Sequence, residues 1–290
     1  MSTHFYIGID GGGTQSKLRL EDQSGQVLAQ TTSGPANIRL SVTDAWQSIY
    51  QGIHTILPQG ISLRDPQYQF HVGMGLAGCE VIEAYQEFLN QPHPFATLKM
   101  TSDAHIACIG AHKANAGAII IIGTGVVGYQ LEGQHNTQVG GWGFPHDDLG
   151  GGAWLGLQAV SLTLQSLDHR IASSPLYRDI FAYFQNNQER MVTWANRATS
   201  SDFASLAPIV VQYSQQQEST AIQLLKQAAK MIDNIGLALE KQQQTQSILP
   251  CCLLGGLASF IEPWVDARLK ERLVVPKNDA CSGAIFMVRA

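Results

Sequence analysis

The first residues in this chain that could do chemistry form a glycine triplet between an aspartate and a threonine, Asp10-Gly11-Gly12-Gly13-Thr14. Glycines have no Cβ, so their backbone N–H groups can approach phosphate oxygens closely. Asp10 could hold a hydrated magnesium ion, because hard cations take carboxylate and water ligands. Taken alone, the triplet is explained equally well as an ordinary hairpin turn. It lies between two predicted strands, which excludes a P-loop and a dinucleotide fingerprint, since both precede a helix.

A second glycine turn, Gly123-Thr124-Gly125, follows the apolar run Ile119–Ile122. A single turn of this kind is a weak signal. Its pairing with the first turn gives it weight, because two glycine hairpins on facing domains can clamp a polyphosphate from both sides. The two turns together indicate a nucleotide-phosphate site.

Asp103 stands where a predicted strand ends and a predicted helix begins. Aspartate is a favoured helix N-cap, so a purely structural role is one interpretation. At the carboxyl end of a sheet strand, the same carboxylate could accept the proton of a substrate hydroxyl. The helix dipole would favour its ionised, basic form. Asp103 is therefore a candidate general base.

The segment Val139–Trp154 contains six glycines, two tryptophans and two aspartates just before a predicted helix. Ordinary loops are shorter and less aromatic. A polyol site needs carboxylates for hydroxyls, exposed backbone N–H groups and an apolar wall for the ring, and this loop supplies all three. We expect it to bind a sugar.

A further pair of glycines, Gly255-Gly256, ends the apolar run Ile248–Leu254, which predicts a buried strand. Two glycines at a strand end would let a flat ring lie against the backbone. Without other information, a tight turn from strand to helix is the simpler interpretation.

Hydrophobic periodicity over the first 112 residues predicts the element order βββαβαβα. The predicted strands cover residues 5–9, 17–20, 26–30, 69–75 and 96–101, and the predicted helices cover residues 41–57, 80–90 and 103–112. From residue 117 a strand, a glycine turn carrying a threonine, a second strand and a hairpin recur, roughly 110 residues after their first occurrence. We interpret this recurrence as the duplication of one domain type.

The predicted fold is α/β, with two domains that share a duplicated βββαβα core around a central cleft. We expect an N-terminal domain over residues 1–115, completed by a C-terminal helix at 279–290, and a second domain over 116–278. The second domain is predicted to be mostly helical between about residues 152 and 244. No low-complexity linker separates the two domains.

Composition narrows the function classes. Hydrophobic residues make up 44% of the 290 residues and charged residues 14%, which is typical of a packed globular protein. A net charge of −5 gives no electrostatic reason to expect nucleic acid or an anionic membrane as a partner. The N-terminus lacks the features of a signal peptide, and the five cysteines form no CxxC pair, so we expect a cytoplasmic protein.

These motifs resemble the BadF/BadG/BcrA/BcrD ATPase-type family, and within it the N-acetylglucosamine and glucosamine kinases. The family belongs to the superfamily of sugar kinases, actin and heat-shock chaperones, which implies actin-like (ribonuclease H-like) domains. The resemblance covers essentially the whole chain, and its most specific part is Gly140-Gly141-Trp142-Gly143 followed by Asp148 and Gly150. It implies an ATP-dependent kinase that phosphorylates the 6-hydroxyl of an amino sugar, with magnesium accompanying ATP.

The resemblance also implies a role for each matching residue. Asp103 is similar to the catalytic base, and Asp10 to the residue that places magnesium through water. The implied phosphate-binding residues are Gly11, Gly12, Gly13, Thr14, Gly123, Thr124 and Gly125. The implied sugar-binding residues are Asn37, Asp103, Gly140, Gly141 and Asp148, and the implied adenosine-side residues are Gly255 and Gly256.

Two positions depart from the family pattern. Val126 replaces the serine of the usual GlyThrGlySer turn, and Leu149 replaces the glutamate of the usual AspGluGlySer segment. The first removes a hydroxyl near the phosphates, and the second removes a carboxylate near the sugar. Three matters stay open in the sequence: whether the sugar is N-acetylated, whether the chain is a homodimer, and what the two departures change.

Two other functions are compatible with the same fold. One is an ATPase that activates a radical dehydratase; such proteins share an iron–sulfur cluster on paired cysteines, and no cysteine lies beside Gly123-Thr124-Gly125. The other is a sugar or nucleotide sensor without catalysis. The presence of both Asp10 and Asp103 favours catalysis.

Overall fold

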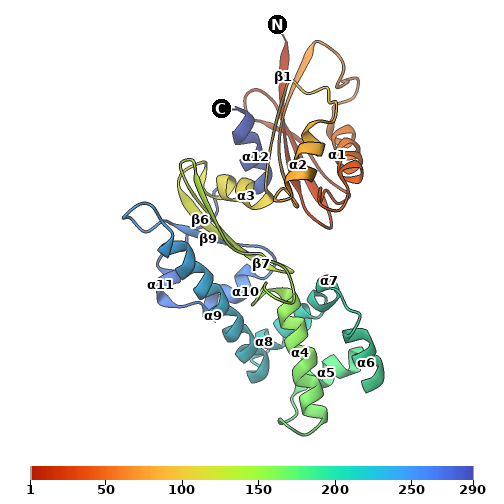
Figure 1. Cartoon of the computed structure of the whole chain (residues 1–290), viewed down its shortest axis with the longest axis vertical. Helices are drawn as coiled ribbons and strands as arrows, with labels where there is room; N and C mark the ends of the chain where they lie inside the picture. The colour runs from red at the N-terminus through yellow and green to blue at the C-terminus, as the bar shows by residue number, and fades with distance from the viewer. Residues whose placement is uncertain (1, 290) are drawn as a thin grey trace. The chain divides into compact units, whose positions relative to one another are not determined.

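The structure, a computed structural model, describes residues 2–289 and consists of two compact units (Figure 1). Of the described residues, the first unit comprises 2–117 and 275–289, and the second comprises 118–274. Each unit has its own sheet and its own buried apolar core. Because each core is separate, the units are described one at a time.

The first unit is built on a five-stranded sheet with the order β3-β2-β1-β4-β5. Its strands are β1 (Thr3–Gly11), β2 (Ser16–Glu21), β3 (Val27–Ser33), β4 (Tyr68–Leu76) and β5 (Thr97–Thr101). Strands β1 and β2 are antiparallel, whereas β1, β4 and β5 run parallel. The parallel strands are apolar on both faces because helices cover both sides of the sheet.

Helices α1 (Val42–Ile56) and α2 (Ile82–Leu89) lie on one face of this sheet, and α3 (Asp103–His112) and α12 (Ala280–Arg289) lie on the other (Figure 1). Helix α1 begins at Ser41, whose hydroxyl accepts the N–H of Asp44 as an N-cap. Its buried side chains recur at helical spacing, which gives the amphipathic face that the sequence predicts.

Helix α12 packs against the sheet through glycines. A Cβ placed on Gly8 of β1 would lie 2.1 Å from the carbonyl oxygen of Cys281, and one placed on Gly73 of β4 would lie 1.9 Å from that of Ala284. The helix backbone therefore touches the strands directly. An ion pair between Arg19 and Asp279 holds the start of the helix to β2.

The first prediction concerns this contact. We expect Gly73→Ala to lower the free energy of unfolding by about 2 kcal/mol, because the added methyl group meets a backbone carbonyl that only a shift of α12 can relieve. Chemical denaturation would measure the loss, and limited proteolysis should show earlier cleavage before α12. Thr32→Ala, at an exposed position of β3, is the control and should change stability by less than about 0.5 kcal/mol. Equal stability of the two variants would contradict the prediction.

The second unit has a four-stranded sheet with the order β8-β7-β6-β9. Its strands are β6 (Gly117–Ile122), β7 (Val126–Glu132), β8 (His135–Gly140) and β9 (Cys251–Leu254). The order repeats that of β3-β2-β1-β4, and β6 and β9 are parallel like β1 and β4. The counterpart of β5 is reduced to one bridge, between Cys251 and Leu273, within the described residues.

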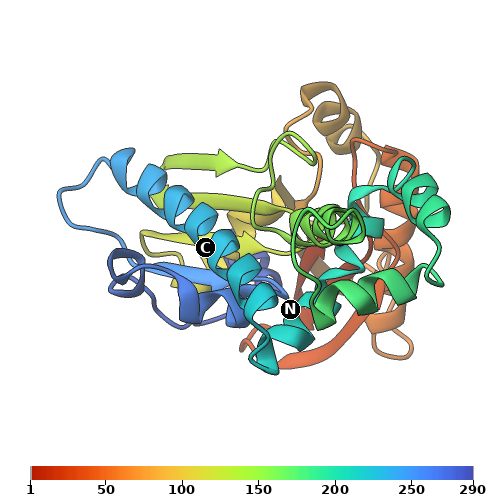
Figure 2. The same ribbon diagram turned by 90° about the horizontal axis from the view of Figure 1, so that it is seen from below.

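Helices make up most of the rest of the second unit. They are α4 (Gly152–Leu167), α5 (Pro175–Tyr183), α6 (Gln188–Ala195), α7 (Ser200–Ala204), α8 (Ala207–Gln215), α9 (Ser219–Lys241), α10 (Ala258–Ile261) and α11 (Ala267–Lys270). A short 3₁₀ helix, η1 (Glu262–Trp264), follows α10. The long helix α9 lies across the sheet, against β7 and β8 (Figure 2).

The predicted α/β fold and the predicted order βββαβαβα of the first half are confirmed. The strand predicted at 248–254 is shorter than expected. It begins at Cys251, because Pro250 has no N–H for a ladder and Ile248 is exposed. The helix predicted at 279–290 is α12, and its last predicted residue, Ala290, lies outside the described residues.

Candidate active site

The parallel strands of the first sheet end at one edge, where the predicted residues of that unit lie. Asp10 of β1 is in register with Gly75 of β4, which in turn is in register with Thr101 of β5. The segments that follow these three positions are Gly11–Thr14, residues 77–80 and Ser102-Asp103. Ligands of open α/β sheets bind at this carboxyl edge.

The turn Gly11–Thr14 has the features of an anion cradle. The N–H of Gly12 bonds the carbonyl of Gln15, at 3.1 Å. In the part of the chain that the structure describes, the N–H groups of Gly13 and Thr14 have no backbone acceptor. Gly11 is needed for space, since a Cβ there would lie 2.4 Å from a methyl carbon of Leu76. Free N–H groups on a glycine turn can bind phosphate oxygens.

Asp10 is half-buried, and its carboxylate has no side-chain or backbone hydrogen-bond donor among residues 2–289. Burial raises its pKa from 3.8 to about 6; Lys17 lowers the pKa, and the charges of Asp103 and Asp279 raise it. Removing a carboxylate from water without donors disfavours its charged form. A hydrated magnesium ion would supply the missing positive charge, so the residues present fit this cation. No group of three or more potential metal ligands occurs among the described residues, and Mg²⁺ commonly uses one or two carboxylates with water and phosphate oxygens.

The second prediction follows from this pKa. Because the folded protein binds the Asp10 proton more tightly than the unfolded chain does, ionisation of Asp10 destabilises the fold as pH rises from about 4 to above 6. We expect Asp10→Asn, measured in EDTA, to be more stable than the unchanged protein by about 2 kcal/mol at pH 7.5. Below pH 4 the difference should vanish, since Asp10 is then protonated in both states. A stability difference that does not change between pH 4 and 7.5 would contradict the assignment.

Asp103 is the first residue of α3, and it is not the helix cap. Ser102 is the N-cap: its hydroxyl accepts the N–H of His105, at 3.2 Å. The carboxylate of Asp103 accepts the N–H of Ala104, at 2.8 Å. Burial raises the pKa of Asp103, the Ala104 N–H lowers it, and the charge of Glu80 raises it. The capping interpretation of Asp103 is therefore wrong, and its carboxylate is held at the edge with a raised pKa.

Asn37 lies beside the first turn. Its backbone forms a bridge with Ala77, which follows β4, and its Oδ1 accepts the N–H of Arg39, at 3.1 Å. Its Nδ2 lies 3.9 Å from where a Cβ of Gly13 would be. The first unit thus places Asn37, Asp10, Asp103 and the glycine turn at one edge of its sheet.

In the second unit, the turn Gly123–Gly125 and the pair Gly255-Gly256 follow two adjacent parallel strands, β6 and β9. Gly255 has a φ of +94°, and a Cβ there would lie 2.4 Å from the carbonyl oxygen of Ile122. The first N–H groups of α4 bond the carbonyls of Gly123 and Thr124. The N–H groups of Thr124 and Gly125 have no backbone acceptor within the described chain, so this turn also offers donors to an anion.

Asp148 contacts this second turn. Its Oδ1 accepts the N–H of Val126, at 3.1 Å, and a Cβ on Gly125 would lie 2.5 Å from its carboxylate carbon. Burial raises its pKa, and the Val126 N–H lowers it. Asp148 adopts the left-handed backbone conformation, with a φ of 62°. Beyond the sugar contact that the sequence predicts, this carboxylate orders the predicted phosphate turn.

The predicted sugar loop has an unusual backbone. Gly140, Gly141, Gly143 and Gly150 all have positive φ. The N–H of Trp142 bonds the carboxylate of Asp147, at 3.0 Å, while the indole of Trp142 is 81% exposed. An exposed indole held by a rigid loop is suited to pack on a sugar ring.

The two departures from the family pattern differ in environment. Val126 is 3% exposed and packs in the core of the second unit. Leu149 is 40% exposed beside Asp148. The change at Val126 is therefore absorbed by the core, whereas the change at Leu149 alters the surface of the loop.

Two charged residues near the edge were not predicted. Lys17 is in register with Asp10, and Glu80, which follows β4, is 3.6 Å from Arg39 in an ion pair. Both shift the pKa of a predicted residue. The sequence does contain a signal for both residues. Lys17 is near the start of β2 and Glu80 comes shortly after the end of β4, and both of these strand ends lie at the same edge of the sheet.

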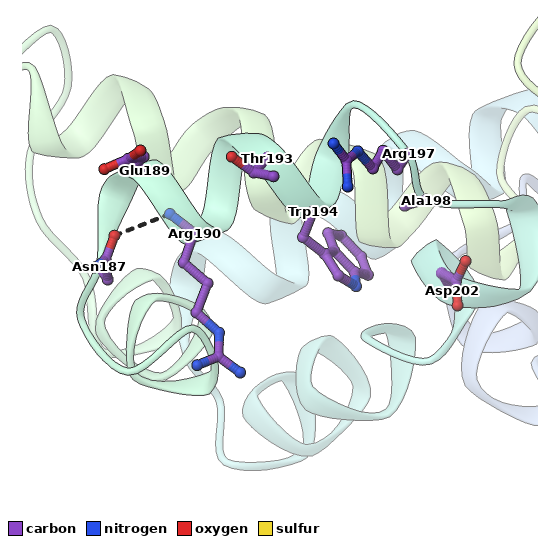
Figure 3. Close-up of a pocket in the computed structure, with 8 residues that line it drawn as sticks. All are labelled: Asn187, Glu189, Arg190, Thr193, Trp194, Arg197, Ala198 and Asp202. Carbon is purple, nitrogen blue, oxygen red and sulfur yellow. Dashed lines mark hydrogen bonds between the residues drawn. The ribbon is translucent and has the colours of Figure 1, made fainter.

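A separate pocket of about 560 Å³ lies on α6 and contains none of the predicted residues. Figure 3 shows the indole of Trp194 in it, with the side chain of Arg190 extending from α6 and that of Arg197 from the turn that follows the helix. Glu189 and Asp202 also line it, so its formal charges balance. It is a different site from those formed by the two glycine turns.

The repeated sheet order, with a glycine turn at the end of the first strand of each repeat, is the arrangement of the actin-like two-domain fold. The chain belongs to the BadF/BadG/BcrA/BcrD ATPase family, whose sequence pattern matches residues 7–284, and the predicted family is thereby confirmed. It is 35% identical over 283 residues to glucosamine kinase GspK of Vibrio cholerae, covering 98% of this chain and 95% of that protein.

Two solved structures share the fold of this chain. A protein from Chromobacterium violaceum assigned as an N-acetylglucosamine kinase superposes with a TM-score of 0.87 and 32% identity, covering 98% of both chains. A ROK family glucokinase from Streptomyces griseus, solved with glucose and AMPPNP, superposes with a TM-score of 0.57 at 11% identity, which shows the shared fold alone. No helix in the described part of the chain is long and apolar enough to cross a membrane.

Proposed function

We propose that this protein is an ATP-dependent amino-sugar kinase that transfers the γ-phosphoryl group of ATP to the 6-hydroxyl of glucosamine or N-acetylglucosamine. The observation that supports it most is the edge of the first sheet, where the half-buried carboxylate of Asp103 lies with Asn37 and a glycine turn that has free N–H groups. The similarity to a glucosamine kinase over almost the whole chain supports the same reaction.

Each residue has a role in this proposal. Asp103 accepts the proton of the sugar hydroxyl as that oxygen attacks phosphorus, and its position fixes the direction of attack. The N–H groups of the two glycine turns stabilise the charge on the phosphate oxygens. Asp10 would hold a magnesium ion through water, and that ion would neutralise charge on the phosphates. Asn37, Gly140, Gly141 and Asp148 bind the sugar.

The wider assignments are proposals of the same kind. The first unit is the sugar-kinase domain, and the second is the nucleotide-binding domain, with Gly255 and Gly256 beside the adenosine. The protein works in the cytoplasm, as a monomer or a homodimer, without nucleic acid or membrane as partners.

A coupled assay of ADP release across hexoses and amino sugars tests the proposal. We expect glucosamine or N-acetylglucosamine to give the highest kcat/KM, with little ADP release when sugar is omitted. ATP hydrolysis that no sugar stimulates would favour an activator ATPase, and ATP binding without turnover would favour a sensor. Either result would overturn the kinase assignment.

A further inference from the structure

A second pocket of the first unit, of about 680 Å³, lies beside the C-terminal half of α1. It is lined by Tyr50, His54, Leu57, Ile61, Ser62, Leu63, Arg64, Pro92, His93 and Pro94. Apart from the residues of α1, the lining comes from the loops 57–67 and 90–96. These loops lead into the N-terminal ends of β4 and β5.

This position separates the pocket from the candidate active site. Asp10 and Asp103 lie at the carboxyl ends of the parallel strands, whereas the pocket lies where β4 and β5 begin. Strand β4 spans nine residues, which corresponds to roughly 25–30 Å. The pocket is therefore at the opposite edge of the same sheet.

The lining has cationic and donor groups and no carboxylate. Arg64 makes no ion pair, and the side chains of Tyr50, His54 and His93 make no hydrogen bond, within the described residues. Arg64 and Tyr50 line the same pocket, and the charge of Arg64 lowers the pKa of Tyr50, which burial raises. In a chain of net charge −5, a pocket without acidic residues favours an anion.

Most of the other residues that line the pocket are apolar. Leu57, Ile61 and Leu63 come from the first loop and its preceding helix end, and Pro92 and Pro94 from the second. The rings of Tyr50 and His93 each stack against Phe95, at centroid distances of 6.1 and 5.3 Å. The stack joins both polar rings to the buried Phe95, so each ring has a packing partner in the core of the unit.

We propose that this pocket is a binding site for a small amphipathic organic anion. The acidic group of the ligand meets the guanidinium of Arg64 and the donors of Tyr50 and His93. Its apolar body lies against Leu57, Ile61 and the two prolines. A carboxylate and a phosphate monoester share this chemistry.

A fluorescence titration with 8-anilinonaphthalene-1-sulfonate, an aromatic anion, tests the site in the full-length protein. We expect one-to-one binding to the folded protein, with at least a five-fold weaker Kd in Arg64→Gln. The matched control is Arg190→Gln, which removes an exposed guanidinium from the pocket on α6 and should leave the Kd unchanged. Arg64 is an exposed loop residue, so the variant should fold normally.

Competition then identifies the acidic group. Octanoate and octyl phosphate should displace the probe, and the stronger of the two shows which group the site prefers, while neutral octanamide should displace it at least ten-fold less well. Equal displacement by octanamide, or an unchanged Kd in both Arg64→Gln and the double variant Arg64→Gln/His93→Gln, would overturn the proposal. The result does not depend on kinase activity, so failure here leaves the proposed reaction untouched.

Discussion

Asp103→Asn is expected to lower kcat by about 10²- to 10⁴-fold without lowering the stability of the protein, because burial already disfavours the charged form of Asp103. A general base contributes a factor of this size, and an amide cannot accept the hydroxyl proton. Ser102 caps α3, so the helix does not depend on the charge of Asp103. The amide oxygen can still accept the N–H of Ala104. Sugar-dependent ADP release and thermal melting, measured on one preparation, would show both effects.

Asp44→Asn is the matched control for this variant. Asp44 also lies in the first turn of a helix of the first unit, but it is exposed and is not one of the proposed site residues. Its replacement should change kcat less than two-fold. If Asp103→Asn retained near-normal turnover, Asp103 would be removed from the mechanism. A large loss of stability without a fall in kcat of the folded fraction would make it a structural residue instead.

Two substitutions of Asp148 are expected to distinguish its predicted contact with the sugar from its hydrogen bond with the Val126 N–H. Asp148→Ala removes the predicted sugar carboxylate and also the acceptor of the Val126 N–H, so KM should rise for both substrates. For the sugar we expect an increase of about 10- to 100-fold, the value of a hydrogen bond to a charged group. Asp148→Asn keeps an acceptor for Val126, so the KM for ATP should stay within about two-fold while that for the sugar still rises. Steady-state kinetics with each substrate varied in turn would measure both constants.

Asp147→Asn provides the control within the same loop. Its carboxylate bonds the backbone of Trp142, and an amide oxygen can replace it there. Both KM values should therefore change little. Equal sugar KM values for Asp148→Asn and the unchanged protein would rule out a contact between the Asp148 charge and the sugar.

Much of the fold could be predicted because local patterns decide it. The helix at 42–56 has an amphipathic period and a serine cap, and the strands of the first sheet alternate or run apolar between glycine turns. The start of β9 was placed too early because apolar residues extend before Pro250, and periodicity alone gives no exact boundary.

The candidate site was predicted in part. Glycine turns and strand-end aspartates are local signals, so Asp10 and Asp103 could be found from sequence. The contact between Asp148 and Val126 joins positions 22 residues apart through a left-handed backbone, and no local propensity gives that pairing. Likewise, the choice of Ser102 over Asp103 as the cap depends on backbone geometry, since both residue types cap helices well.

The packing of α12 against Gly8 and Gly73 has a consequence for synthesis on the ribosome. The last residues of the chain complete a unit whose sheet is made first, and the whole second unit is translated between them. At ribosomal rates of about 5–20 residues per second, the glycine-lined face of β1 and β4 stays uncovered for roughly 8–30 s. The second unit can therefore fold before the first is complete, while this face of the first sheet is still exposed to solvent.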